Sequence, residues 1–203
     1  MKVIAIELNH VIRNINKQLL KYYSRDINQE LDIDDIDEKT ENVIDKYIKF
    51  PSKQEFGRFI YEDYPYELFG CANAMEKNLP TKITYWMSEM TNIEEEDVVV
   101  IFFSLGEDAL TIQSSYFFLS KIGTRVRKVL FPLTEQEVFN EADVIVTSNV
   151  ELLSNAPSEK TKVLICTNGT KEEDSKEGFK VYKSLIDLID DKNFLTELVK
   201  NND

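Results

Sequence analysis

The sequence predicts an α/β protein with a mostly parallel sheet and a helical insertion after the first strand. Several short apolar runs are continuous rather than alternating, as in strands buried on both faces. These runs cover residues 2–8, 97–105, 127–133, 142–148 and 161–167. Helical patterns lie between them, and strands that alternate with helices favour right-handed crossovers in an open sheet. Ligands of such sheets bind at the carboxyl ends of the strands, so we expect any site there.

Helix boundaries are marked by particular residues. The expected helices of the core are 107–123, 134–142, 149–157 and 181–202, the last as one amphipathic helix or a pair. Gly123 and Pro157 are natural stops for the first and third of them. Thr134 is the expected N-cap of the second, with Glu137 completing a capping box.

The segment 15–95 has a different character, because it is long, poor in strands and rich in aromatic residues. We therefore expect a core formed by 1–14 and 96–203 and a cap-like insertion of several helices formed by 15–95. Its acidic part, 26–45, is interpreted as a solvated loop and helix start.

A calcium loop is the sharper alternative for this acidic part. Asp32, Asp34 and Asp35 are suggestive, but the Gly and the terminal Glu that such a loop needs are misplaced.

The composition of the chain excludes several classes of function. The chain has 203 residues, 42% of them hydrophobic, which is enough for one domain with a proper core. A net charge of -13 argues against sequence-independent nucleic-acid binding and against docking on anionic membranes, but it leaves basic protein partners open. Two distant cysteines favour a reducing compartment. With no signal-peptide pattern and no apolar run long enough for a membrane span, we expect a soluble, cytoplasmic-type protein.

The first strand ends in Glu7-Leu8-Asn9. The layout resembles the haloacid dehalogenase (HAD) superfamily, especially its nucleotidase-like phosphatases, which have a Rossmann-like core and a helical cap after the first strand. The resemblance implies Asp-x-Asp here, the first Asp attacking the phosphoryl group and the second acting as general acid/base. Glu7 instead adds one methylene, which moves the carboxylate by about 1.5 Å. Asn9 cannot exchange a proton near neutral pH.

The other motif positions of the family are only partly retained. Ser104 matches the Ser/Thr that holds the phosphoryl group, although a serine before a helix is commonly an N-cap. Lys128 or Lys121 would match the phosphate-neutralising lysine. Thr147 and Ser148 replace the acidic pair that holds magnesium, and neutral hydroxyls are poor ligands for this cation.

Other residues offer less. His10 is the only histidine, and a Ser-His-Asp arrangement would need Ser104 or Ser148 beside it; a surface or capping role is favoured. Cys166 is expected in the core and Cys71 in packing of the insertion. The sequence TNGT (167–170) is interpreted as a turn after the last strand.

Trp86 and the aromatic set at 56–69 suit either a core or a protein interface.

These observations lead to a catalytically inactive HAD-like scaffold that binds other proteins, as a homo-oligomer or in a multi-protein assembly, with no catalytic residue, cofactor or metal. The composition and the degenerate core also resemble gene products of crAss-like bacteriophages, which implies a virion component such as a ring protein of the tail.

Two alternatives remain open. The first is a magnesium-dependent phosphatase or nucleotidase. In it, Glu7 would be the nucleophile or a metal ligand, and magnesium would also be bound by Asp143, Asp108 or Glu107. The second is a phosphate-binding regulator that uses Ser104 and the adjacent helix N-terminus.

Overall fold

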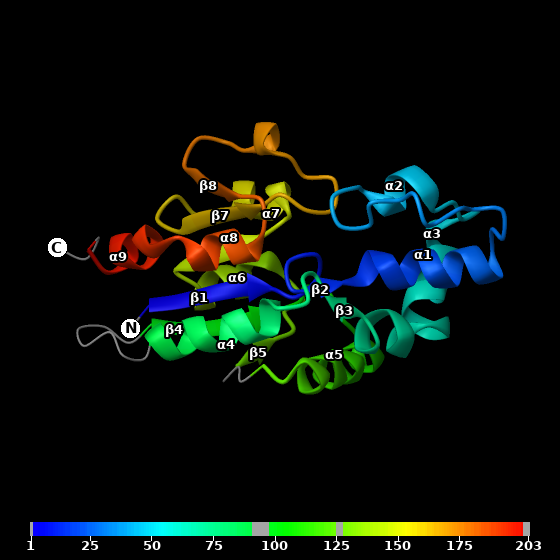
Figure 1. Ribbon diagram of the computed structural model, residues 1–203, viewed down its shortest axis with the longest axis horizontal. Helices are drawn as coiled ribbons and strands as arrows, with labels where there is room; N and C mark the ends of the chain where they lie inside the picture. The colour runs from blue at the N-terminus through cyan, green and yellow to red at the C-terminus, as the bar shows by residue number, and fades with distance from the viewer. Residues whose placement is uncertain (1, 91–97, 125–127, 201–203) are drawn as a thin grey trace.

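The core of the protein is a six-stranded parallel sheet (Figure 1). The computed structural model describes residues 2–90, 98–124 and 128–200. The strands are β1 (Lys2–Glu7), β4 (Val98–Phe103), β5 (Val129–Leu130), β6 (Val144–Thr147), β7 (Thr161–Ile165) and β8 (Phe179–Tyr182), in the order β5-β4-β1-β6-β7-β8. Every neighbouring pair is parallel, which confirms the predicted α/β fold class. The first residues of two predicted strands, 97 and 127, lie outside the described residues.

The strand β8 was not predicted, and the helical interpretation of 181–202 is wrong at its start. Two helices follow β8, α8 (Leu185–Asp190) and α9 (Lys192–Lys200). All four residues of β8 are only partly buried, because the strand lies at the edge of the sheet. Such a strand has no continuous apolar run, and that run was the signal by which the others were found.

Helices cover both faces of the sheet. Ile4 and Ile6 of β1 point to the face packed by α4 (Leu79–Met90), α5 (Ala109–Ile122), α8 and α9. Ala5 points to the other face, which is packed by α6 (Glu135–Glu141) and α7 (Val150–Asn155). Burial on both faces is why these strands are apolar at successive positions.

Two of the residues predicted to mark helix ends in the core are confirmed in that role. Gly123 ends α5 in the left-handed conformation, with φ of 69°. Thr134 and Glu137 form the capping box of α6. No helix in the described part of the chain is long and apolar enough to cross a membrane.

The insertion forms a cap at the carboxyl ends of the strands (Figure 1). It contains α1 (Ile15–Asp26), α2 (Val43–Tyr47), α3 (Lys53–Arg58) and two π-helical turns, η1 (Phe59–Asp63) and η2 (Tyr66–Gly70). These elements share a hydrophobic cluster of their own. The chain leaves and re-enters the core through a two-stranded antiparallel ribbon, β2 (Arg13–Asn14) and β3 (Asn73–Ala74).

Helix α4 belongs to the predicted insertion 15–95 but packs with the sheet. Leu79, Ile83 and Trp86 lie in the same cluster as Ile4 and Ile6 of β1. The division into 1–14 and 96–203 against 15–95 stays a prediction.

The loop after β7 holds the cap against the core. The backbone amides of Asn168 and Gly169 donate to the carbonyl oxygens of Lys39 and Thr40, both at 2.7 Å. Gly169 has φ of +87°, and a Cβ added there would lie 2.6 Å from Cβ of Asn42. The predicted turn at 167–170 is therefore present, although β8 still follows it. Its glycine allows the close approach of cap and core.

Candidate functional site at the carboxyl edge of the sheet

A tight turn follows β1. The carbonyl oxygen of Leu8 accepts hydrogen bonds from the backbone amides of Ile12 and Arg13, at 3.0 and 2.7 Å. His10 has φ of 64°, a conformation that non-glycine residues seldom adopt. The chain turns back on itself within four residues, which brings the side chain of Arg13 beside Asn9.

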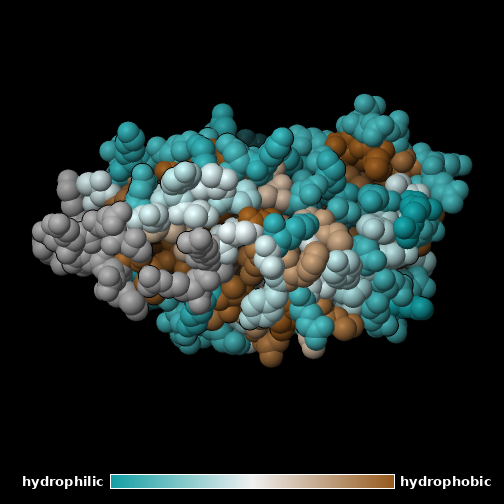
Figure 2. Space-filling view, turned by 60° about the horizontal axis from the view of Figure 1, so that its bottom comes forward, coloured by the Kyte–Doolittle hydropathy of each residue, from teal (hydrophilic) through white to brown (hydrophobic). Residues whose placement is uncertain are grey.

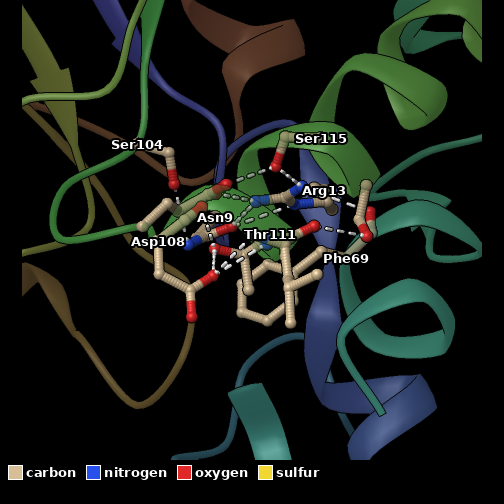
Figure 3. A network of polar contacts seen from close by, with 10 residues as sticks. Asn9, Arg13, Phe69, Ser104, Asp108, Thr111 and Ser115 are labelled. Atoms are coloured by element: carbon tan, nitrogen blue, oxygen red, sulfur yellow. Dashed lines mark hydrogen bonds and ion pairs between the residues drawn. The ribbon is translucent and has the colours of Figure 1, made fainter. Parts of the chain in front are cut away.

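The guanidinium of Arg13 fills the space next to the acid/base position of the HAD motif (Figure 3). Nε and Nη2 donate to Oδ1 of Asn9, at 3.0 and 2.5 Å. Nη1 donates to the carbonyl oxygen of Phe69 and to Oγ of Ser115, at 3.2 and 2.5 Å. Nη2 also donates to Oε1 of Glu107 at 2.6 Å. An arginine has five N–H donors, and these five hydrogen bonds give each of them an acceptor.

Charge is balanced within this buried network. Arg13 is fully buried and forms its ion pair with Glu107, whose other oxygen accepts from Oγ of Ser115 at 2.6 Å. The guanidinium carbon lies 5.0 Å and 5.5 Å from the ring centroids of Phe69 and Phe118. Burial lowers the pKa of Arg13, and the charge of Glu107 opposes that shift. Because Asn9 is neutral, the network contains one cation, Arg13, and one anion, Glu107.

Asn9 and Ser104 are joined by a hydrogen bond. Nδ2 of Asn9 donates to Oγ of Ser104 at 3.1 Å, and Ser104 is fully buried. The N-cap interpretation of Ser104 is wrong, because Asp108 caps α5. Its Oδ1 accepts from the amides of Leu110 and Thr111, at 3.1 and 2.9 Å. An aspartate thus already holds the helix N-terminus that a bound phosphate would use.

Glu7 faces β6. Its Oε2 accepts a hydrogen bond from Oγ1 of Thr147, which in turn accepts from the backbone amide of Asn149 at 2.9 Å. Burial raises the pKa of Glu7 to about 7, although the hydrogen bonds from Thr147 and the Ser148 backbone and the charge of Arg13 oppose the shift. Thr147 and Ser148, predicted as the replaced acidic pair, therefore lie beside the predicted nucleophile position.

His10 has the opposite electrostatic behaviour. Burial, reinforced by the charge of Arg13, lowers its pKa to about 4, so the ring is neutral at physiological pH. Its carbonyl oxygen accepts from Oγ1 of Thr167 at 2.7 Å. His10 is a partly buried residue of the β1 turn, and its predicted surface or capping role stays a prediction.

These two pKa shifts predict opposite dependences of stability on pH. Glu7 binds its proton more tightly in the folded state, so its contribution to stability falls as pH rises from about 4.5 to about 7. His10 binds its proton less tightly when folded, so its contribution rises between about pH 4 and 6.5. Denaturation midpoints measured across pH 4–8 should show wild type losing stability relative to Glu7→Gln and gaining it relative to His10→Asn. Parallel pH curves for the three proteins would contradict both assignments.

The two candidate lysines lie elsewhere. Nζ of Lys128 pairs with Oε2 of Glu141 at 2.5 Å on an exposed surface. Nζ of Lys121, on α5, donates to the carbonyl oxygens of Gly70 and Ala72. Lys121 therefore joins α5 to the cap rather than facing Glu7.

The carboxylates considered for magnesium are not gathered around Glu7. Glu107 pairs with Arg13, and Asp108 caps α5. Asp143 precedes β6 at the opposite end of the sheet, where its Oδ2 accepts from the amide of Val3 at 2.8 Å. No group of three or more His, Cys, Asp or Glu in the described residues could hold a metal ion. The donor set at this edge does not fit magnesium.

The remaining predicted residues are mostly structural. Trp86 is buried in the sheet's cluster. Most of the aromatic set at 56–69 lies in or against the cap's own cluster, but Tyr61 and Tyr66 are exposed. Cys71 is partly buried as a free thiol, and Cys166 follows β7 and is likewise only partly buried rather than a core residue.

Arg13 is the residue that sequence reasoning missed. The available signal was a lone charge in an otherwise buried stretch, with Val11, Ile12 and Ile15 around it. A charge among buried residues requires partners, and their identity depends on contacts distant in sequence.

Comparison with solved structures supports the fold. A protein described as a haloacid dehalogenase-like hydrolase, from Burkholderia xenovorans LB400, superposes with a TM-score of 0.57 at 10% sequence identity. The match covers 95% of this chain and 97% of that one. No protein-family model and no curated protein matches the sequence. The chain therefore has a HAD-like, Rossmann-like α/β fold, and its activity must be argued from its own residues.

Proposed function

We propose that this protein is a non-catalytic HAD-fold scaffold that binds other proteins. The observation that carries the proposal is the contact between Asn9 and Arg13. The side chain at the acid/base position is an amide bound on one side to a buried guanidinium and on the other to Ser104. It has no proton to exchange and no freedom to turn toward a substrate.

Glu7 alone does not supply phosphoryl transfer. Its carboxyl group has a raised pKa and is bound by Thr147, so the charged nucleophile is scarce below neutral pH. Phosphoryl transfer depends on charge stabilisation by metal ions and cations. The carboxylates that could supply a metal site are engaged in the ion pair with Arg13, in the cap of α5, or at the far end of the sheet.

An exposed apolar surface supports the binding role. We call it the α5 face; its members come from η2, α5 and the segment after β5, and each is at least 44% exposed. They are Tyr66, Leu110, Tyr116, Phe117 and Leu133. The rings of Tyr66 and Phe117 contact each other at a tilt of 47°, with centroids 5.1 Å apart. Figure 2 shows hydrophobic side chains gathered on the side of the molecule where α5 and β5 lie. Aromatic residues of this kind are enriched in protein interfaces.

A second copy of the chain is the partner we test first. In solution, light scattering coupled to size exclusion should give the mass of an oligomer for wild type. Tyr116→Glu/Phe117→Glu should reduce that mass to a monomer, because two charges would be desolvated in the contact. Tyr85→Glu is the matched control, since Tyr85 is 70% exposed on α4. A wild-type monomer that also co-purifies with no partner would contradict the scaffold role.

The finer proposal is a ring in a bacteriophage tail. It rests on the composition of the sequence and on the degenerate motif. A ring needs a head-to-tail contact that closes after a fixed number of copies. Electron microscopy of the purified assembly tests it: closed rings are the expected result, and a two-fold dimer would contradict it.

A further inference from the structure

A groove at the junction of cap and core is lined with lysines. It has a volume of about 560 Å³, and its lining includes residues of β2 and β3, the two strands that connect cap and core. Its charged lining residues are Lys17, Lys39, Lys77, Lys121 and Glu38. Four cations and one anion surround this groove in a chain whose net charge is -13. The local charge is therefore opposite in sign to that of the molecule.

Two of these ammonium groups are available to a ligand. No carboxylate among the described residues lies within 4 Å of Nζ of Lys39 or of Lys77. Lys17 is held loosely, since its Nζ is 3.9 Å from Oε1 of Glu38. The charges of Glu76 and Asp37 act on Lys39 only from beyond that distance. An anion in the groove would relieve the repulsion that remains among the lysines.

Part of the groove lining is apolar. Met75, Pro80 and Ile122 line the groove together with the lysines. The volume lies in the range of small-molecule sites, about 300–1,000 Å³. A ligand that fits would combine several negative charges with a flat or apolar portion.

We infer that this groove binds an organic polyphosphate of nucleotide size, with its phosphates on the lysines and its apolar portion against Met75, Pro80 and Ile122. Lys17 and Lys39 come from the insertion, whereas Lys121 comes from α5 of the core. Such a ligand would therefore join cap to core. This site is separate from Glu7 and Asn9 and needs no turnover, so its failure would leave the proposed function untouched.

Calorimetric titration at low ionic strength tests the inference, with ATP, inorganic pyrophosphate and adenosine as probes. ATP should bind most tightly, pyrophosphate more weakly and adenosine least, because only ATP supplies both charge and a ring. Lys39→Gln and Lys77→Gln should each weaken ATP binding about tenfold, the size expected when one hydrogen bond to a charged group is lost.

Lys53→Gln and Lys176→Gln are the matched controls, because each removes one charge from an exposed position outside the groove. They should leave ATP affinity within about twofold. The inference is overturned if neither ATP nor pyrophosphate binds at roughly 1 mM. It is equally overturned if the groove variants and the controls bind ATP alike, since the anion would then bind elsewhere.

Discussion

Replacing Arg13 by Ala is expected to destabilise the protein by about 3–5 kcal/mol, as is typical when one partner of a buried ion pair is removed. The substitution leaves Glu107 charged, buried and without its ion-pair partner. It also removes donors from Asn9, Ser115 and the Phe69 carbonyl, which belong to separate parts of the fold. Urea denaturation followed by circular dichroism measures the change.

The double variant Arg13→Met/Glu107→Met separates the charge from the packing. Removing both charges avoids the uncompensated anion, and such apolar replacements are often neutral or better. The double variant should therefore be more stable than Arg13→Ala. A loss below about 1 kcal/mol for Arg13→Ala would mean that the network does not hold the site together.

Replacing Gly169 by Ala should cost about 2–4 kcal/mol, which combines overpacking with an unfavourable backbone conformation. The new Cβ would meet Cβ of Asn42 at 2.6 Å and its backbone nitrogen at 3.0 Å. The amides of Asn168 and Gly169 would then move away from the cap, to which they are bonded at 2.7 Å. Thermal and chemical denaturation should both show the loss.

Gly178 provides the control for this substitution. Its φ of +88° is almost the same as that of Gly169, but an added Cβ would contact nothing within 4 Å. Gly178→Ala should therefore show the backbone cost alone. Equal losses for the two variants would argue that the approach of the loop to Asn42 does not hold the cap.

The sheet could be predicted from sequence because its central strands are buried on both faces. β1, β4, β6 and β7 are continuous apolar runs, and that pattern is strong in a single sequence. Strand β8 could not be predicted from the sequence, since an edge strand carries partly buried residues that suit a helix equally well.

The sequence predicted where the candidate site lies in the fold, but it did not predict the hydrogen bonds of Arg13 within it. At the carboxyl edge of the sheet Asn9 contacts Ser104, and Glu7 contacts Thr147. Apart from Asn9, the hydrogen-bond partners of Arg13 lie 56 to 102 positions away in the chain, so no local pattern encodes them. Lys128 was matched on residue type alone, and its partner Glu141 lies on α6.

On the proposed function, the side chains at the former motif positions of this HAD-like fold have a structural role. Asn9 serves as an acceptor for Arg13 and a donor to Ser104, which ties the end of β1 to the end of β4 and to the cap. Asn9 itself is only partly buried, but both of its side-chain groups are engaged within the protein. The strand ends then stabilise the joint between cap and core, while the α5 face remains exposed.

Phosphate release is the measurement that tests the central claim most directly. Wild type and Glu7→Gln would be incubated with Mg²⁺ and either p-nitrophenyl phosphate or a panel of nucleoside monophosphates. Both proteins are expected to release phosphate at the same background rate, because Asn9 cannot transfer a proton and no carboxylate set beside Glu7 holds the metal. Magnesium-dependent turnover by wild type that Glu7→Gln abolishes would contradict the account.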